Sequence, residues 1–243
     1  MAKYVLSSRV YIYVILIFMM KYIFLGIAGL LVLGFIHAVN NKPIIKSKSE
    51  SIKMTGEKRL RRESDKVALF AGGCFWSLES YFEKIPNGLV DVVSGYSGGA
   101  SNNPTYENYA EGGHREVVEV TYDPTKISYG ALVEYYFRHI DPTDADGSFY
   151  DRGLNYTSAI YYEDNEERKI AEDVITIINK EKVFKKPIAT VVLSRSGFWP
   201  AEDYHQDYAR NNALRYAAYR TGSGRDAFLK KTWEGKEGVL YKQ

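Results

Sequence analysis

The chain has 243 residues, with 32 lysines and arginines, 30 aspartates and glutamates, and a formal net charge of +2. This small charge gives no support for nucleic-acid binding, and 45% hydrophobic residues suffice for a sizeable core. The only cysteine, Cys74, excludes an internal disulfide framework and a zinc site built from cysteines. We therefore expect one catalytic domain with an N-terminal extension.

Residues 1–39 are predicted to form a signal peptide or a membrane anchor. Two apolar runs, Val10 to Met20 and Tyr22 to Ile36, are separated by Lys21. A lysine inside a single span would cost about 2.5–3.5 kcal/mol on insertion scales. We therefore favour the second run as the h-region of a signal peptide that is cleaved near Ala38.

Residues 40–65 are predicted to form a flexible basic linker. They are polar and charged, contain few residues that could build a core, and include Lys58, Arg59, Arg61 and Arg62. Such a composition favours a solvated linker over a basic patch that touches anionic lipid.

Strand and helix patterns alternate through the predicted catalytic domain at 66–243. Strands are expected at Val67–Phe70, Leu89–Gly95, His114–Tyr122, Thr157–Tyr162 and Ile188–Leu193. Helices are expected at Phe75–Ile85, Ser128–Ile140 and Asp164–Lys182, with helix and loop after Trp199. Loops are expected at Ser97–Pro104 and Asp144–Asn155. This alternation indicates an α/β or α+β domain of two layers.

Cys74 lies at a predicted strand-to-helix turn. The strand that ends at Phe70 is followed by Gly72 and Gly73, which allow a tight turn, and Phe75 begins the helix. Unpaired N–H groups at a helix N-terminus favour negative charge, so we expect Cys74 to ionise more easily than a free cysteine. A thiolate is a nucleophile, whereas the structural alternative is a cysteine that only fills a buried space.

Six segments of the domain match short motifs, in order along the chain. They are Gly73–Trp76 (GCFW), Ser94–Gly99 (GYxGG), Asn103–Tyr106 (NPTY), Gly113–Val117 (GHxEAV, with Val117 replacing alanine), Asp151–Ile160 (DxGxQYRSAI) and His205–Tyr208 (HQxY). Together they resemble the peptide methionine sulfoxide reductases of the A type, which reduce the S epimer of methionine sulfoxide. The resemblance implies a two-layer α/β sandwich with a ferredoxin-like core and no bound cofactor or metal.

The resemblance implies four catalytic residues, Cys74, Glu116, Tyr106 and Tyr156. The Cys74 thiolate would attack the sulfoxide sulfur, because a thiolate is the fitting nucleophile for that atom. The oxygen gains negative charge as the S–O bond weakens, so it needs hydrogen-bond donors and then a proton. Tyr106 and Tyr156 would supply the donors, and a buried Glu116 with a raised pKa would supply the proton.

The same resemblance implies a substrate-binding surface next to Cys74. Phe75 and Trp76 would form an apolar wall around the S-methyl group, and Asp151 would make a polar contact with the substrate main chain. Gly73, with Gly72, would let that main chain approach.

By pattern alone, each of these residues has a structural alternative. Glu116 alternates with apolar residues and would face solvent on its strand. Tyr106, Tyr156 and Trp76 could be packing residues, and Asp151 could cap a turn.

Two departures from the family motifs flank Tyr156, because Asn155 stands in place of glutamine and Thr157 in place of arginine.

The lack of a second cysteine matters more, because a sulfenic acid formed on Cys74 has no internal partner. An external thiol must regenerate it, which we expect to be a thioredoxin-like protein, glutaredoxin or a small thiol.

The expected partners are oxidised proteins and peptides that carry methionine-S-sulfoxide, and a thioredoxin-like reductant. We expect no nucleic-acid partner and a monomer. The N-terminal run predicts an exported protein of the envelope or periplasm, in which the enzyme repairs oxidised proteins. The alternative is membrane attachment through 10–39, including a cytoplasmic protein with a membrane anchor.

Two other functions remain open at this point. The first is an acyl-transferring hydrolase in which His114 or His205 acts as the base for Cys74. The second is a membrane-tethered binding module whose tyrosines form a recognition surface. Neither explains why six motifs occur in order.

Overall fold

The computed structural model describes residues 60–238 and 240–241, which all belong to one compact unit, Glu57–Gln243. The predicted signal or anchor segment lies outside the described residues, as does the predicted linker up to residue 59. Within the described ranges, no helix combines the length and the apolar character that a bilayer crossing requires.

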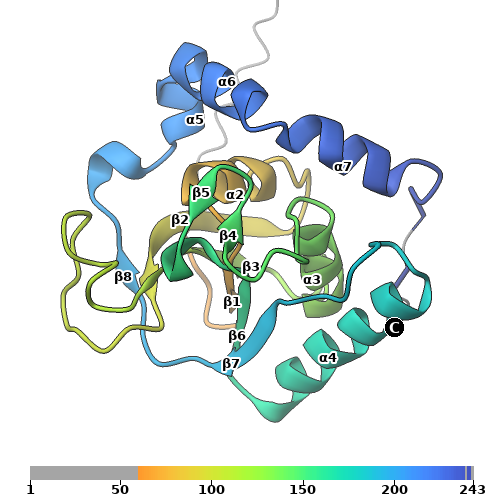
Figure 1. Ribbon diagram of the computed structural model, residues 1–243. Helices are drawn as coiled ribbons and strands as arrows, with labels where there is room; N and C mark the ends of the chain where they lie inside the picture. The colour runs from red at the N-terminus through yellow and green to blue at the C-terminus, as the bar shows by residue number, and fades with distance from the viewer. Residues whose placement is uncertain (1–59, 239, 242–243) are drawn as a thin grey trace, which may run out of the picture. The chain divides into compact units, whose positions relative to one another are not determined.

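A six-stranded mixed sheet forms the centre of this unit (Figure 1). Its order is β7-β6-β1-β3-β2-β8; β6 and β7 are parallel, and every other neighbouring pair is antiparallel. The strands are β1 (Lys66–Ala71), β2 (Leu89–Ser97), β3 (Arg115–Tyr122), β6 (Ala159–Tyr162), β7 (Val191–Ser194) and β8 (Trp199–Pro200).

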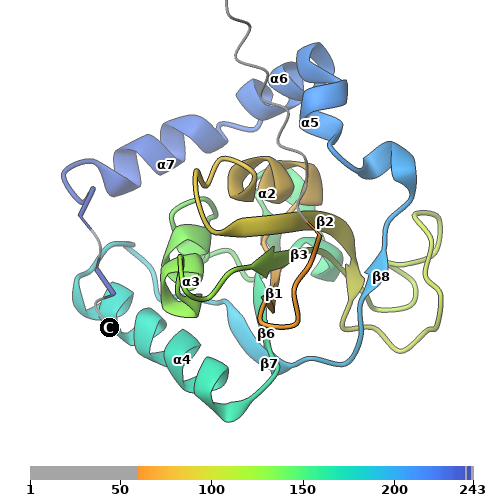
Figure 2. The same ribbon diagram turned by 180° about the vertical axis from the view of Figure 1, so that it is seen from behind.

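Helices cover the sheet and extend along one end of the unit. They are α2 (Phe75–Phe82), α3 (Tyr129–Phe137), α4 (Asn165–Lys180), α5 (Tyr208–Asn211), α6 (Ala213–Gly222) and α7 (Arg225–Trp233), with short 3-10 turns η1 (Leu154–Tyr156) and η2 (Asp203–His205). In both views the blue helices α5, α6 and α7 run past α2 (Figures 1 and 2). The predicted α/β class is confirmed.

Both faces of β1 and β3 are buried, because the two strands are central in the sheet. Phe70 and Val118 face the main core, which the helices complete. Leu69 and Val117 face a smaller apolar cluster on the other side. Glu116 shares the helix-covered face with Val118 and is 2% exposed, so the expectation from pattern alone that it faces solvent is wrong.

Local sequence signals explain where two of the helices begin. The Ser128 side chain accepts the Ala131 N–H at 3.2 Å before α3. The Asp164 carboxylate accepts the Glu167 N–H at 2.8 Å before α4. Both are N-caps that satisfy amide groups left without a partner inside the helix.

Several expected boundaries are wrong. The helix expected at Ser128–Ile140 ends at Phe137, and the strand expected from Ile188 begins at Val191. The helix α2 ends at Phe82 rather than at Ile85, because Pro86 disfavours helical backbone at the residue before it. The expected loop at 144–155 contains a hairpin of β4 (Gly147–Ser148) and β5 (Asp151–Arg152). This hairpin brings Asp151 to the side of the unit that carries Cys74.

Candidate active site

Cys74 is the N-cap residue of α2, and its backbone carbonyl accepts the Ser77 N–H at 3.1 Å. The residue is 6% exposed. Gly73 before it has a φ of +91°, a conformation that favours glycine. A Cβ at Gly73 would lie 2.5 Å from the Ser148 hydroxyl, so this turn requires glycine both for its backbone and for the packing against β4.

The carboxyl group of Glu116 is fixed next to Cys74 by two hydrogen bonds. Its Oε2 accepts the Phe75 N–H at 2.9 Å, and its Oε1 accepts the Tyr109 hydroxyl at 2.9 Å. The first bond joins β3 to the first turn of α2, immediately after Cys74. The structure thus brings together Cys74 and Glu116, which are 42 positions apart in the sequence.

Burial sets the protonation states of both groups. It raises the pKa of Glu116 to about 8, although the hydrogen bonds from Phe75 and Tyr109 oppose the shift. Glu116 therefore holds a proton below about pH 8, as a proton donor must. The raised pKa that the sequence predicts for a buried glutamate is confirmed.

The expectation that Cys74 ionises more easily than a free cysteine is wrong. Burial raises the pKa of the Cys74 thiol well above its ordinary value, and the negative charges of Glu116 and Asp151 add to this. The Trp76 N–H at the helix N-terminus and the positive charge of Arg225 lower the pKa, but they do not outweigh burial. At neutral pH, Cys74 in this structure is a thiol.

Tyrosine hydroxyls surround the Glu116 carboxyl. The Tyr156 hydroxyl lies 3.4 Å from the Tyr109 hydroxyl, which also accepts the Asn155 amide at 3.0 Å. The ring of Tyr106 stacks on that of Tyr109 with centroids 6.0 Å apart, and Tyr106 is 41% exposed. Burial and the charge on Glu116 raise the pKa of Tyr156, so its hydroxyl keeps its proton.

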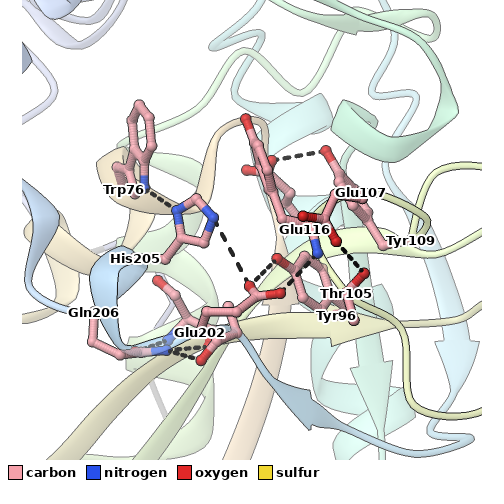
Figure 3. A network of polar contacts seen from close by, with 12 residues as sticks. Trp76, Tyr96, Thr105, Glu107, Tyr109, Glu116, Glu202, His205 and Gln206 are labelled. Atoms are coloured by element: carbon pink, nitrogen blue, oxygen red, sulfur yellow. Dashed lines mark hydrogen bonds and ion pairs between the residues drawn. The ribbon is translucent and has the colours of Figure 1, made fainter.

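Trp76 is held by two aromatic partners. Its Nε1–H donates to His205 Nδ1 at 3.0 Å, and its ring stacks on Tyr208 with centroids 3.7 Å apart. Figure 3 shows the His205 ring between Trp76 and Glu202, whose carboxylate lies 3.9 Å from His205 Nε2. Phe75 lies beneath, buried against His205 at a centroid distance of 5.0 Å.

Asp151 joins the site from β5. It accepts a hydrogen bond from the Tyr219 hydroxyl of α6, and its charge raises the pKa of both Cys74 and Glu116. All the residues that the sequence predicts for this site are therefore gathered around the N-terminus of α2.

Sequence reasoning missed Tyr109, Tyr219 and Arg225. Tyr109 follows the NPTY motif by three residues, and its burial inside a turn gave no periodic signal. Tyr219 and Arg225 belong to the C-terminal helices, which the sequence predicted only as helix and loop.

The two histidines of the hydrolase hypothesis have other partners. His114 accepts the Gly99 N–H at 3.2 Å and contacts the Ser101 carbonyl at 2.9 Å, and His205 accepts from Trp76. Neither forms the nucleophile–base pair that acyl transfer requires. Among the described residues, no group of three or more His, Cys, Asp and Glu side chains could hold a metal ion.

A buried thiol beside a protonated carboxyl and several phenols defines the site of a cysteine-dependent enzyme that can supply both a nucleophile and a proton. Comparison with known proteins identifies its family. The family model described as "Peptide methionine sulfoxide reductase" matches residues 66–237. This chain belongs to that family, in its A type, and is a peptide-methionine (S)-S-oxide reductase, an oxidoreductase.

Relatives of known sequence and structure agree with this assignment. The chain is 49% identical over 173 residues to peptide methionine sulfoxide reductase MsrA 2 of Rhizobium meliloti, covering 71% of this chain and 86% of that protein. It is 46% identical over 176 residues to MsrA of Bacillus licheniformis, covering 72% and 97%.

Two solved structures resemble the described unit. The reduced form of Mxr1 from Saccharomyces cerevisiae has a TM-score of 0.59 and 27% identity, and covers 64% of this chain and 90% of that chain. Methionine sulfoxide reductase A of Corynebacterium diphtheriae has a TM-score of 0.55 and 30% identity, and covers 63% and 77%.

The hydrogen bond between Trp76 and His205 gives a prediction. In His205→Phe the ring remains but the acceptor is lost, so the Trp76 indole N–H should exchange with solvent roughly fivefold faster. In the wild type the bond should persist below pH 6.5, because burial lowers the pKa of His205 and keeps Nδ1 an acceptor. Indole N–H resonances measured by NMR check both points.

His139→Phe is the matched control, since His139 packs against Tyr81 and Tyr135 instead of Trp76. An unchanged exchange rate of the Trp76 indole N–H in His205→Phe would contradict the hydrogen bond from Trp76 to His205.

Proposed function

We propose that this enzyme reduces methionine-S-sulfoxide, both in proteins and as the free amino acid, through attack of Cys74 on the sulfoxide sulfur. The observation that carries the proposal is the hydrogen bond from the Phe75 N–H to Glu116, which holds a protonated carboxyl beside the only thiol. The nucleophile and the proton donor that the reaction needs are therefore neighbours.

The first step conserves atoms, electrons and protons. The Cys74 sulfur first bonds to the sulfoxide sulfur. The protonated oxygen then passes to the Cys74 sulfur as the S–O bond and the new S–S bond break, giving methionine and a sulfenic acid on Cys74. Glu116 gives its proton to the oxygen, and the proton that leaves the thiol restores Glu116. Cys74 sulfur is oxidised by two electrons, and the substrate sulfur is reduced by two.

Electrostatic repulsion couples the two groups. A thiolate at Cys74 disfavours a carboxylate at Glu116, so ionisation of the thiol keeps the carboxyl protonated. The repulsion that raises the pKa of Cys74 thus keeps a proton available on Glu116 when the nucleophile forms. Tyr106 and Tyr156 donate hydrogen bonds to the oxygen as its negative charge grows.

The substrate lies against aromatic side chains in this proposal. Trp76 and Phe75 form the apolar wall for the S-methyl group, with Trp76 held in place by His205 and Tyr208. Asp151, oriented by Tyr219, holds the substrate main chain. Gly73 contributes the turn that places Cys74 at the N-terminus of α2, and its missing side chain leaves room beside Ser148.

Regeneration requires an external thiol, because Cys74 is the only cysteine of the sequence. Two thiol groups reduce the sulfenic acid to the thiol, with release of water and formation of one disulfide between them. A thioredoxin-like protein, glutaredoxin or a small thiol fits this step.

Three further assignments belong to the proposal. The connectivity β1-α2-β2-β3-α3-β6, with the order β6-β1-β3-β2, supports a ferredoxin-like core. The apolar run in residues 10–39 supports export to the envelope with repair of oxidised proteins there, by cleavage or by anchoring. We also propose that the enzyme acts as a monomer.

The proposed reaction predicts strict stereochemistry. The full chain, given separate S and R epimers of a blocked methionine sulfoxide with excess dithiothreitol, should consume only the S epimer. Cys74→Ser should abolish consumption, and Glu116→Gln should slow it by roughly 10²–10⁴-fold, because a general acid contributes that much. Chromatography of the two epimers measures the result.

Glu79→Gln is the matched control for Glu116→Gln. Glu79 is also buried, and its pKa is also raised to about 8, but it lies farther along α2. Equal loss of activity in both variants would contradict a specific role for Glu116, and consumption of the R epimer would contradict the proposed selectivity.

The proposed intermediate gives another prediction. Enzyme treated with substrate in the absence of thiols should carry one sulfenic acid on Cys74, which dimedone labelling and mass spectrometry detect. Addition of a thioredoxin-like protein, glutaredoxin or a small thiol before dimedone should reduce the sulfenic acid, so that Cys74 is no longer labelled and turnover is restored. A disulfide between two enzyme chains as the main product would contradict regeneration by an external thiol.

A further inference from the structure

Arg225 is a buried cation, and part of its guanidinium group forms no hydrogen bond within the described part of the chain. It is the first residue of α7 and is 1% exposed. Its Nε and Nη2 have no hydrogen-bond partner among the described residues. A buried charge of this kind is costly unless an opposite charge is nearby, so its position calls for a counter-charge.

The neighbouring acidic residue does not provide that counter-charge. Asp226 accepts two hydrogen bonds from Arg220 Nε, at 2.8 and 2.9 Å. The guanidinium of Arg225 instead lies 4.5 Å above the centre of the Phe149 ring. A ring face attracts a cation, but it accepts none of the directed bonds that Nε–H and Nη2–H can donate.

The guanidinium lies against the backbone that leads into Cys74. A Cβ built on Gly73 would be 3.4 Å from Arg225 Nη2 and 2.5 Å from the Ser148 hydroxyl, another buried group without a partner. Since Gly73 has no side chain, Arg225 can approach this turn closely. Arg225 belongs to α7, which lies outside all six of the sequence motifs.

Arg225 is a positive charge near Cys74, whereas the neighbouring carboxyl groups are negative when ionised. Glu116 on β3 and Asp151 on β5 disfavour a thiolate, and the phenols of Tyr106, Tyr156 and Tyr219 surround it without charge. The positive charge of Arg225 acts in the opposite direction and favours the thiolate. The negative charge that appears on Cys74 when its thiol ionises is therefore the charge that Arg225 is placed to meet.

We propose that Arg225 is a positioning residue that stabilises the Cys74 thiolate across the space left by Gly73. It makes the nucleophile available in a buried site whose carboxyl groups oppose its formation. The proton that leaves the thiol replaces the one that Glu116 gives to the sulfoxide oxygen, and Arg225 keeps its own. This inference rests on the proposed function, because it explains how the attacking group of that reaction is formed.

Alkylation of Cys74 tests the inference without using a sulfoxide. Iodoacetamide reacts with the thiolate, and the full chain has no other cysteine, so the rate reports this residue alone. In Arg225→Met and Arg225→Gln, the rate at neutral pH should fall roughly tenfold or more, because each removes an opposite charge near the thiol. The pH profile of the rate should move to higher pH, and Arg225→Lys should recover most of the rate.

Arg220→Met is the matched control. Arg220 is a partly buried arginine that lies over the Tyr81 ring at 4.7 Å and pairs with Asp226. Its loss should lower the melting temperature without moving the alkylation profile. A wild-type profile in a folded Arg225→Met or Arg225→Gln variant would overturn the proposal.

A measurement on the wild type keeps the test independent of how the variants fold. The Arg225 Nε–H resonance of protein labelled with ¹⁵N-arginine should shift as Cys74 ionises, and the shift should be absent in Cys74→Ser. A resonance that does not respond to ionisation of Cys74 would also overturn the proposal. Because neither readout involves sulfoxide, lack of reductase activity with a normal Arg225 response would contradict only the proposed function.

Discussion

The hydrogen bond from the Phe75 N–H to Glu116 is the contact on which the rest of the site depends. It uses an amide that the first turn of a helix leaves without an internal partner. It also fixes a carboxyl from the centre of the sheet against the residue that follows Cys74. Strand, helix and thiol are thereby held in one arrangement, and burial then determines which of the groups carry protons.

Burial has a cost and a benefit in this arrangement. It opposes ionisation of Cys74 and so limits the resting thiolate. The same low-dielectric surroundings keep Glu116 protonated at neutral pH and strengthen the interaction of any thiolate with donors and cations. A buried site can therefore keep its nucleophile as a thiol and its acid protonated at rest. The Trp76 N–H and Arg225 then stabilise the negative charge of the thiolate when it forms.

The sequence predicted the elements that carry strong local signals. The strand before Cys74 and the N-caps Ser128 and Asp164 are examples, because turn chemistry and apolar periodicity act over a few residues. The ordered motifs also identified most, though not all, of the residues that the structure gathers around Cys74. Contacts between distant segments were harder to predict.

The errors have physical reasons. The helix N-terminus beside Cys74 is visible in the sequence, but the burial of Cys74 is not, so the direction of the Cys74 pKa shift was predicted wrongly. Alternation along β3 suggested an exposed Glu116, because the pattern cannot tell whether a second layer covers that face. Tyr109, Tyr219 and Arg225 reach the site only through tertiary packing, for which the sequence carries no periodic signal.

The protonation state of Glu116 decides whether this carboxyl can act as the proton donor. NMR of the full chain with ¹³C-labelled glutamate carboxyl groups, compared with Glu116→Gln to assign the resonance, follows this one carboxyl through a pH titration. We expect a midpoint near pH 8. A midpoint near the ordinary value of 4.5 would mean that Glu116 is a carboxylate at neutral pH, and would contradict its role as the proton donor.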